Sequence, residues 1–89
     1  MDDVAEARTR DSVREIIAEL APNRDAKVVD EAHLVDDLEF ASLSLTELAF
    51  TLEDQFDLPT IDEPVARSIS TVGHICDHVV REIRARQVS

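Results

Sequence analysis

Glycine and proline are scarce in this 89-residue chain, which holds one Gly and three Pro and so has little material for tight β-hairpins. No stretch alternates apolar and polar residues with a period of two, so the sequence predicts no strands. The single cysteine, Cys76, has no internal disulfide partner, and nothing indicates an oxidising compartment. No apolar run approaches the roughly 20 residues that span a bilayer, and the N-terminus is acidic, unlike a signal peptide. We therefore expect a cytoplasmic protein with no membrane partner.

Basic residues are missing from the centre of the chain. Residues 30–63 contain eleven acids and no base, within a chain of 20 acids, nine bases and a net charge of −11. A polyanion repels nucleic acid and anionic lipid, so we expect no nucleic-acid partner and favour partners with basic surfaces. Taken alone, the acidic run fits a solvated face as well as a docking face.

Helical spacing of apolar residues accounts for most of the chain, which is long enough for one domain (1–89, with its core at about residues 4–86 and frayed termini). A first helix is predicted to end at Pro22-Asn23, and a second to run from near Ser42 to Asp57. Asp62 is a candidate cap for a short helix from Glu63 to Ser68, and Ser70 or Thr71 for the last helix. The predicted fold is all-α: a small antiparallel bundle of three main helices plus one short helix, with a long first loop. The predicted core positions of the first and last helices are Val13, Ile16, Ile17 and Leu20, and Val72, Ile75, Cys76, Val79 and Ile83.

The first loop spans about 20 residues, a length that is uncommon in a compact domain and often functional. It is not merely polar, because five apolar residues are spaced along it as anchors for packing on the helices: Val28, Val29, Leu34, Leu38 and Phe40.

The second helix has two apolar faces. On a helical wheel of about 100° per residue, Leu43 and Phe50 lie opposite the core side chains and are two turns apart. Scattered exposed apolar residues are normal on a protein surface, but large apolar residues flanked by acids favour a docking strip. We predict that docking residues are Leu43, Thr46, Glu47, Phe50, Glu53 and Asp54. The core stripe of the same helix is Leu45, Leu48, Ala49, Leu52 and Phe56.

Ser42 stands at the predicted start of this helix. Its simplest role is that of a helix cap, and Ser44 with Glu47 also fits a capping box. A hydroxyl at a helix N-terminus is in addition placed where unpaired N–H groups favour a phosphate. No His or Lys lies near Ser42 in the sequence, so a modifying enzyme would have to supply the base.

Other patterns for chemistry are weak. The segment from Asp36 to Glu47 has the length of an EF-hand loop. It carries Ala41 where that loop requires Gly, so we predict that it does not bind calcium. His74 and His78 have a spacing that can chelate zinc, yet no third ligand is evident, and ordinary surface histidines are the better interpretation. Cys76 falls on the apolar stripe and is predicted to be buried. We predict no metal site, no catalytic residue and no enzyme activity.

The stretch D-D-L-E-F-A-S-L-S-L-T-E-L (residues 36–48), followed by L-E-D-Q-F-D (52–57), resembles the acyl carrier protein family over about residues 34–62. The I-S-T-V at 69–72 resembles the start of that family's last helix. Two positions depart from the family pattern, because Glu39 stands where Gly is usual and Ala41 where an Asp commonly tied to loading is usual. The resemblance implies that Ser42 accepts 4′-phosphopantetheine from coenzyme A.

The resemblance also implies a role and a set of partners. The thiol of the arm would hold an acyl, polyketide or aminoacyl intermediate as a thioester. Partners would be a phosphopantetheinyl transferase and loading, ketosynthase-type or tailoring enzymes with basic docking surfaces, and the carrier would be a monomer. Polyketide, peptide and fatty-acid synthesis all fit. The alternative is an unloaded module of the same fold that only binds protein.

Overall fold

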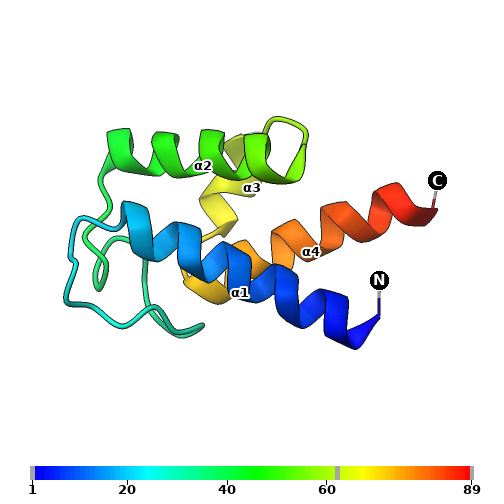
Figure 1. Cartoon of the computed structure of the whole chain (residues 1–89). Coiled ribbons are helices and arrows are strands. Elements are labelled where there is room, and N and C mark those ends of the chain that lie inside the picture. The colour runs from blue at the N-terminus through cyan, green and yellow to red at the C-terminus, as the bar shows by residue number, and fades with distance from the viewer. Residues whose placement is uncertain (1, 62, 89) are drawn as a thin grey trace.

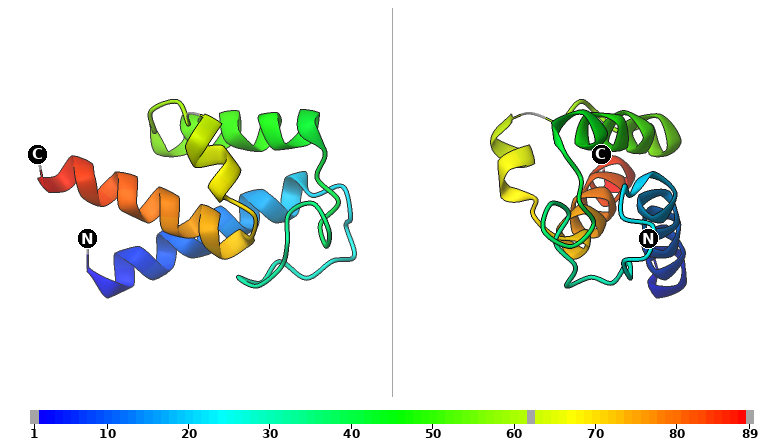
Figure 2. Two further views of the ribbon diagram at one scale, coloured as in Figure 1. Left: turned by 180° about the vertical axis from the view of Figure 1, so that it is seen from behind. Right: turned by 90° about the vertical axis from the view of Figure 1, so that its left-hand side faces the viewer.

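Helices arranged as a bundle form the molecule (Figure 1). The computed structural model describes residues 2–61 and 63–88, and within these the chain forms α1 (Asp3–Leu20), α2 (Ser42–Phe56), α3 (Glu63–Ser68) and α4 (Val72–Val88). Helix α1 packs against both α2 and α4 and runs antiparallel to them, while the short α3 crosses between the end of α2 and the start of α4 (Figures 1 and 2). The prediction of three main helices and one short one is confirmed. None of the helices within the described residues combines the length and apolarity needed to cross a membrane.

Helix α1 ends where its sequence predicts, and it begins at Asp3. The Oδ1 atom of Asp2 accepts the backbone N–H of Ala5 at 2.8 Å and so caps the first turn. The helix ends at Leu20, because Ala21 precedes a proline and adopts an extended backbone. Val13 and Ile17 are fully buried between the helices, as the apolar spacing predicts.

Backbone pairing joins the long first loop to the start of α4. Antiparallel hydrogen bonds connect the loop segment 30–34 to residues 70–73, although within the described residues this pairing stays an isolated bridge and forms no strand. The loop therefore satisfies part of its backbone without a sheet. The bonds are Leu34 N–H to Ser70 O (3.0 Å), Val72 N–H to Ala32 O (3.0 Å) and Gly73 N–H to Asp30 O (2.9 Å).

Apolar side chains of the loop enter the core. Leu34, Leu38 and Phe40 are at most 3% exposed, and burial of each contributes about 1.5–3 kcal/mol to stability. Val28 is half-buried, but Val29 is 46% exposed, so the prediction that it anchors the loop is wrong. Ala32, which the apolar pattern did not single out, is buried beside the pairing with α4.

Thr71 caps α4, and His74 completes the cap. The Thr71 hydroxyl accepts the N–H of His74 at 3.2 Å, while Nδ1 of His74 accepts the N–H of Ser70 at 3.1 Å. This reciprocal arrangement confirms a cap at Ser70 or Thr71. The proposed cap of α3, Asp62, lies outside the described residues. The predicted core positions of α4 are buried except Ile83, which is half-buried, and Val80 is buried in addition.

The turn before α2 places Glu39 in a left-handed conformation, with a φ of 62°. This backbone turns the chain between two buried residues, Leu38 and Phe40. For an L-residue other than glycine, the left-handed region costs roughly 1–2 kcal/mol. Glu39 thus keeps a turn that glycine would form with less strain.

We predict that Glu39→Gly raises the free energy of unfolding by about 0.5–1 kcal/mol, because glycine relieves the strain but gains entropy in the unfolded chain. Urea denaturation measures the change. Glu31→Gly is the matched control, since Glu31 is an exposed loop residue without a positive φ, and this change should lower stability. If both variants lost the same free energy of unfolding, the strain assigned to the Glu39 backbone would be contradicted.

Candidate functional site

Ser42 is the first residue of α2 and is exposed to solvent. The chain leading to it is held by the buried side chain of Phe40, whose N–H donates to the carbonyl oxygen of Leu34 at 2.9 Å. The helical ladder then begins with Leu45 N–H donating to Ala41 O at 2.8 Å. Hydrogen bonds thus hold the chain on both sides of Ser42, while Ser42 itself is exposed.

The cap of α2 differs from the predicted one. Ala41, not Ser42, occupies the cap position, and its side chain cannot cap. Ser44 does so instead from inside the first turn: its hydroxyl oxygen accepts Ala41 N–H at 2.8 Å and lies 3.0 Å from Ala41 O, to which it donates. The predicted capping by Ser42 and the box pairing Ser44 with Glu47 are therefore wrong. Ser42 has no structural task in the cap.

The first turn of α2 fits a phosphodiester on the Ser42 oxygen. The leading N–H groups of a helix have no partner within the helix and, with the helix dipole, favour an anion. The first turn contains no acidic residue that would repel a phosphate. Ala41 stands where acyl carrier proteins, which this sequence resembles, usually have Asp. The cap position of α2 is therefore uncharged.

The three histidines lie elsewhere, and His33 is an exposed residue of the first loop. His74 uses Nδ1 in the cap of α4, and His78 is buried between α4 and its neighbours. Within the described residues, no hydrogen bond joins the Ser42 hydroxyl to a histidine, and no cluster of three or more metal-ligating side chains forms. The interpretation of His78 as a surface histidine is wrong, since it is 8% exposed.

The outer face of α2 carries two large exposed apolar side chains. Leu43 is 75% exposed and Phe50 64%, whereas Leu48 and Leu52 on the inner face are 2% exposed. Of the other residues predicted for docking, three are also exposed and one is half-buried. The exposed residues are Thr46, Glu47 and Asp54, and the half-buried one is Glu53.

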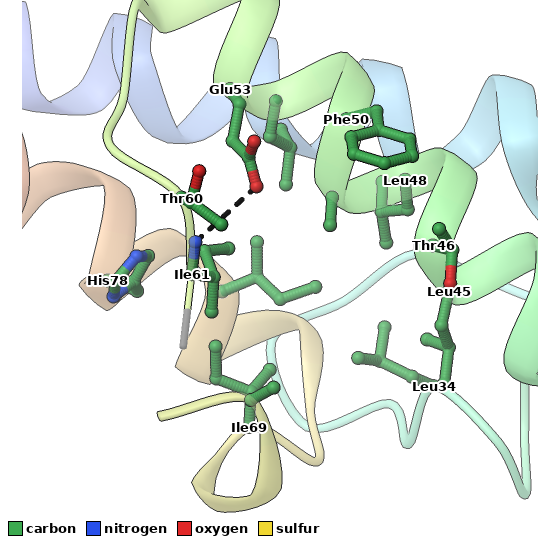
Figure 3. A pocket seen from close by; sticks show the side chains of 14 residues that line it. Leu34, Leu45, Thr46, Leu48, Phe50, Glu53, Thr60, Ile61, Ile69 and His78 are labelled. Carbon is green, nitrogen blue, oxygen red and sulfur yellow. Dashed lines mark hydrogen bonds between the residues drawn. The ribbon is translucent and has the colours of Figure 1, made fainter. Parts of the chain in front are cut away.

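Glu53 faces inward more than the helical wheel indicated. Its Oε2 accepts the N–H of Ile61 at 3.5 Å, a long contact that links α2 to the segment after it (Figure 3). Glu53 thereby lies beside a cavity as well as beside the outer face.

A cavity of about 330 Å³ opens beneath α2. This volume lies at the lower end of the range for small-molecule sites. Its walls come from α2, α3, α4, the first loop and the segment after α2, and most of the lining is apolar (Figure 3). Because Phe50 also lines it, the outer face and the cavity share a border.

Cys76 is fully buried, as predicted. Burial raises the pKa of its thiol, because the thiolate would lose hydration, although Arg14 partly offsets this. The only thiol of the polypeptide is thus a poor nucleophile at neutral pH.

Comparison with known proteins places the chain in a family. The sequence profile described as "Phosphopantetheine attachment site" matches residues 11–79, which is most of the chain. The chain therefore belongs to the phosphopantetheine-attachment family, whose domain carries 4′-phosphopantetheine covalently and is not itself catalytic.

A solved structure supports the same conclusion. The chain is similar to an acyl carrier protein from Mycobacterium tuberculosis, with 30% sequence identity, a TM-score of 0.68, and coverage of 86% of this chain and 96% of that one. The resemblance to acyl carrier proteins is thus confirmed for both fold and family.

We predict that the two serines at the start of α2 differ in their effect on stability. Ser44→Ala removes the bond to the Ala41 N–H and should lower the free energy of unfolding by about 0.5–1.5 kcal/mol. Ser42→Ala should change it by less than about 0.5 kcal/mol. Urea denaturation of both variants is the measurement, and a larger loss for Ser42→Ala would refute the assigned cap.

Proposed function

We propose that Ser42 is the attachment residue for 4′-phosphopantetheine and that the loaded protein carries acyl, polyketide or aminoacyl intermediates between enzymes. The observation that supports this most is the exposed, structurally unused hydroxyl at the start of α2, within the stretch matched by the attachment-site family. The arm supplies a terminal thiol on which a carboxylic acid is held as a thioester.

The chain's own part in loading is to offer the Ser42 oxygen. That oxygen forms a new bond to phosphorus and displaces the nucleotide part of coenzyme A, while the serine proton passes to a base. Because no base among the residues that the structure describes contacts Ser42, we assign the proton acceptor to the transferase. The unpaired N–H groups of the first turn then lie beside the resulting phosphodiester.

The outer face of α2 supports delivery of the cargo. Leu43 and Phe50 offer apolar contact area of modest size, while Glu47 and Asp54 attract basic surfaces and orient them. Such contacts favour fast encounters over tight complexes, which suits a carrier that visits several enzymes in turn. A tethered cargo reaches each active site at a high effective concentration.

We predict that the protein gains the mass of one phosphopantetheinyl group when it is incubated with coenzyme A and a broad-specificity transferase. Ser42→Ala should gain none, while Ser44→Ala, the matched control two residues away, should be loaded. Intact-mass spectrometry is the measurement.

Thiol labelling gives a second readout of the same step. Since Cys76 is buried, a maleimide should label the loaded wild type and leave the unloaded protein unmodified under native conditions. Modification that persists in Ser42→Ala would reject the assignment. Absence of loading with several transferases would favour the unloaded protein-binding module.

We predict that Glu47→Lys/Asp54→Lys slows transfer of cargo to a partner enzyme and weakens the dependence of that rate on salt. The measurement is the transfer rate at several ionic strengths. The control is Glu15→Lys/Glu31→Lys, which changes the net charge equally at exposed positions outside α2. Identical effects of the two double variants would mean that only net charge matters, and the proposed docking face would be rejected.

A further inference from the structure

Three polar groups at the start of α4 surround one ring nitrogen of His74. Nδ1 of His74 accepts the N–H of Ser70 at 3.1 Å and the N–H of Thr71 at 3.4 Å, and the Ser70 hydroxyl oxygen lies 3.3 Å from it. A ring nitrogen that accepts N–H groups carries no proton of its own, so the imidazole is neutral and its proton is on Nε2. The bonds therefore require one protonation state and one tautomer of His74.

This cap is a capping box with a histidine in the place of the usual acceptor. Thr71 is the cap residue and His74 the third helical residue, and each side chain bonds the backbone N–H of the other. Glutamate or glutamine ordinarily holds this third position, and their oxygens accept a bond throughout the neutral pH range. Imidazole ordinarily gains a second proton at about pH 6.5, and it then has two donors and no acceptor. The cap is therefore sensitive to pH in a range where the usual box is not.

The first loop lies beside this cap and is paired with the same backbone (Figure 2). Val72, the first residue of α4, donates its N–H to the carbonyl oxygen of Ala32 at 3.0 Å. Ser70 donates its N–H to His74 and accepts the N–H of Leu34 at 3.0 Å. Bonds to the histidine and bonds to the loop thus alternate along one short segment, so loss of the cap loosens the pairing with the loop.

The charged groups nearest the ring give a second proton little support. The helix dipole places positive charge at the start of α4, and Arg81 adds to it. Asp77 would attract an imidazolium, but its carboxylate already bonds Arg10 at 2.9 Å. These groups meet at a hollow of about 190 Å³, which is lined by Ser68, Ile69, His74, Asp77, His78 and Arg81.

The elements packed against the start of α4 also leave the ring without a free carboxylate among the described residues. The residues of the hollow that come from α3 and the segment after it are uncharged. In the first loop, His33 is exposed and stands opposite Thr71 in the bridge, while Asp30 bonds Arg14 of α1 at 2.9 Å. The His74 side chain belongs to an exposed residue, so protons from water reach it.

We propose that His74 is a pH-sensitive latch between α4 and the first loop. Neutral His74 holds the N–H groups of Ser70 and Thr71 and keeps the loop paired. Protonated His74 cannot accept these bonds, so the two N–H groups turn to water and loop segment 30–34 opens more often. The stability that the latch contributes is present at neutral and alkaline pH and is lost as the pH falls below about 6.5. This inference holds whatever Ser42 carries, because it concerns the backbone of the loop that leads there.

The first test is the nitrogen NMR spectrum of the imidazole rings in the full-length, unloaded protein at about pH 8. The ring of His74 should show an unprotonated Nδ1 and a protonated Nε2. Its signals are identified by their loss in His74→Gln. A neutral ring with its proton on Nδ1 would overturn the proposal.

Thermal unfolding at about pH 8 and about pH 5.5 then compares the wild type with His74→Gln and His74→Ala. Glutamine keeps an acceptor at both pH values, whereas alanine has none at either. The wild type should match His74→Gln at the higher pH and His74→Ala at the lower, a relative fall in Tm of about 4 °C. Acid also relieves repulsion among the carboxylates of this chain, whose net charge is −11, but that effect is common to all three proteins.

His33→Gln is the matched control, because His33 is an exposed histidine on the other side of the same bridge. This variant should keep the pH dependence of the wild type. If the wild type and His74→Gln showed parallel pH dependence, or if His33→Gln abolished the difference, the latch would be rejected.

Amide hydrogen exchange locates the change within the molecule. On acidification, the protection of the Leu34 and Val72 N–H groups should fall about fivefold more in the wild type than in His74→Gln. The N–H of Leu58, which bonds Glu53 O at 3.0 Å after α2, should show no such difference. An equal loss of protection at Leu58 would mean that acid acts on the whole fold, and the proposed release of the loop would be overturned.

Discussion

Pairing between the first loop and the start of α4 is the constraint on which the site depends. A loop of this length loses much conformational entropy on ordering and needs partners for its backbone. The bonds from Val72 N–H to Ala32 O and from Leu34 N–H to Ser70 O supply them, at 3.0 Å each. The carbonyl of Leu34 also accepts the N–H of Phe40, which stands two residues before Ser42. The constraint thus passes from α4 through the loop to the proposed attachment residue.

Helix α2 carries large apolar side chains on two surfaces, one buried and one exposed. Its inner face packs Leu48 and Leu52 into the core, while its outer face keeps Leu43 and Phe50 in water. For a helix that needed only to be stable and soluble, outer leucine and phenylalanine side chains would bring no benefit. Under the proposed docking role, both would be covered briefly by another protein, and the nearby acids would select a basic partner. The small exposed apolar area agrees with the weak interface proposed here.

Most of the fold follows from the sequence, because helical periodicity and punctuation by proline and capping residues are local properties. The predicted end of α1 and the predicted limits of α2 agree with the structure, and so do the exposure of Phe50 and the burial of Cys76. What failed depended on three-dimensional detail. A shift of one residue in the start of α2 decides whether Ser42 or Ser44 caps the helix. The burial of His78 depends on how α4 is rotated against α2 and α3. The spacing of three from Ile75 to His78 was the available signal for that burial. The inward turn of Glu53 depends on Ile61, which lies eight residues further along the chain.

The features that cost stability gather around α2 and the cavity. Glu39 adopts a left-handed backbone just before the helix, Phe50 is exposed at the cavity's border, and the Nε2 atom of His78 is buried with no hydrogen-bond partner among the described residues. Selection for stability alone would remove each of these by a single substitution, and functional sites are where such unfavourable features are retained. The opposite side of the molecule is different in kind, since α1 and α4 join there through ordinary half-exposed ion pairs such as Arg10 with Asp77 at 2.9 Å. One side of the structure is therefore a conventional pair of packed helices. The other side, around α2 and the cavity, contains backbone strain and a buried polar atom without a hydrogen bond among the described residues. That second side is where a tethered cargo and a visiting enzyme would meet.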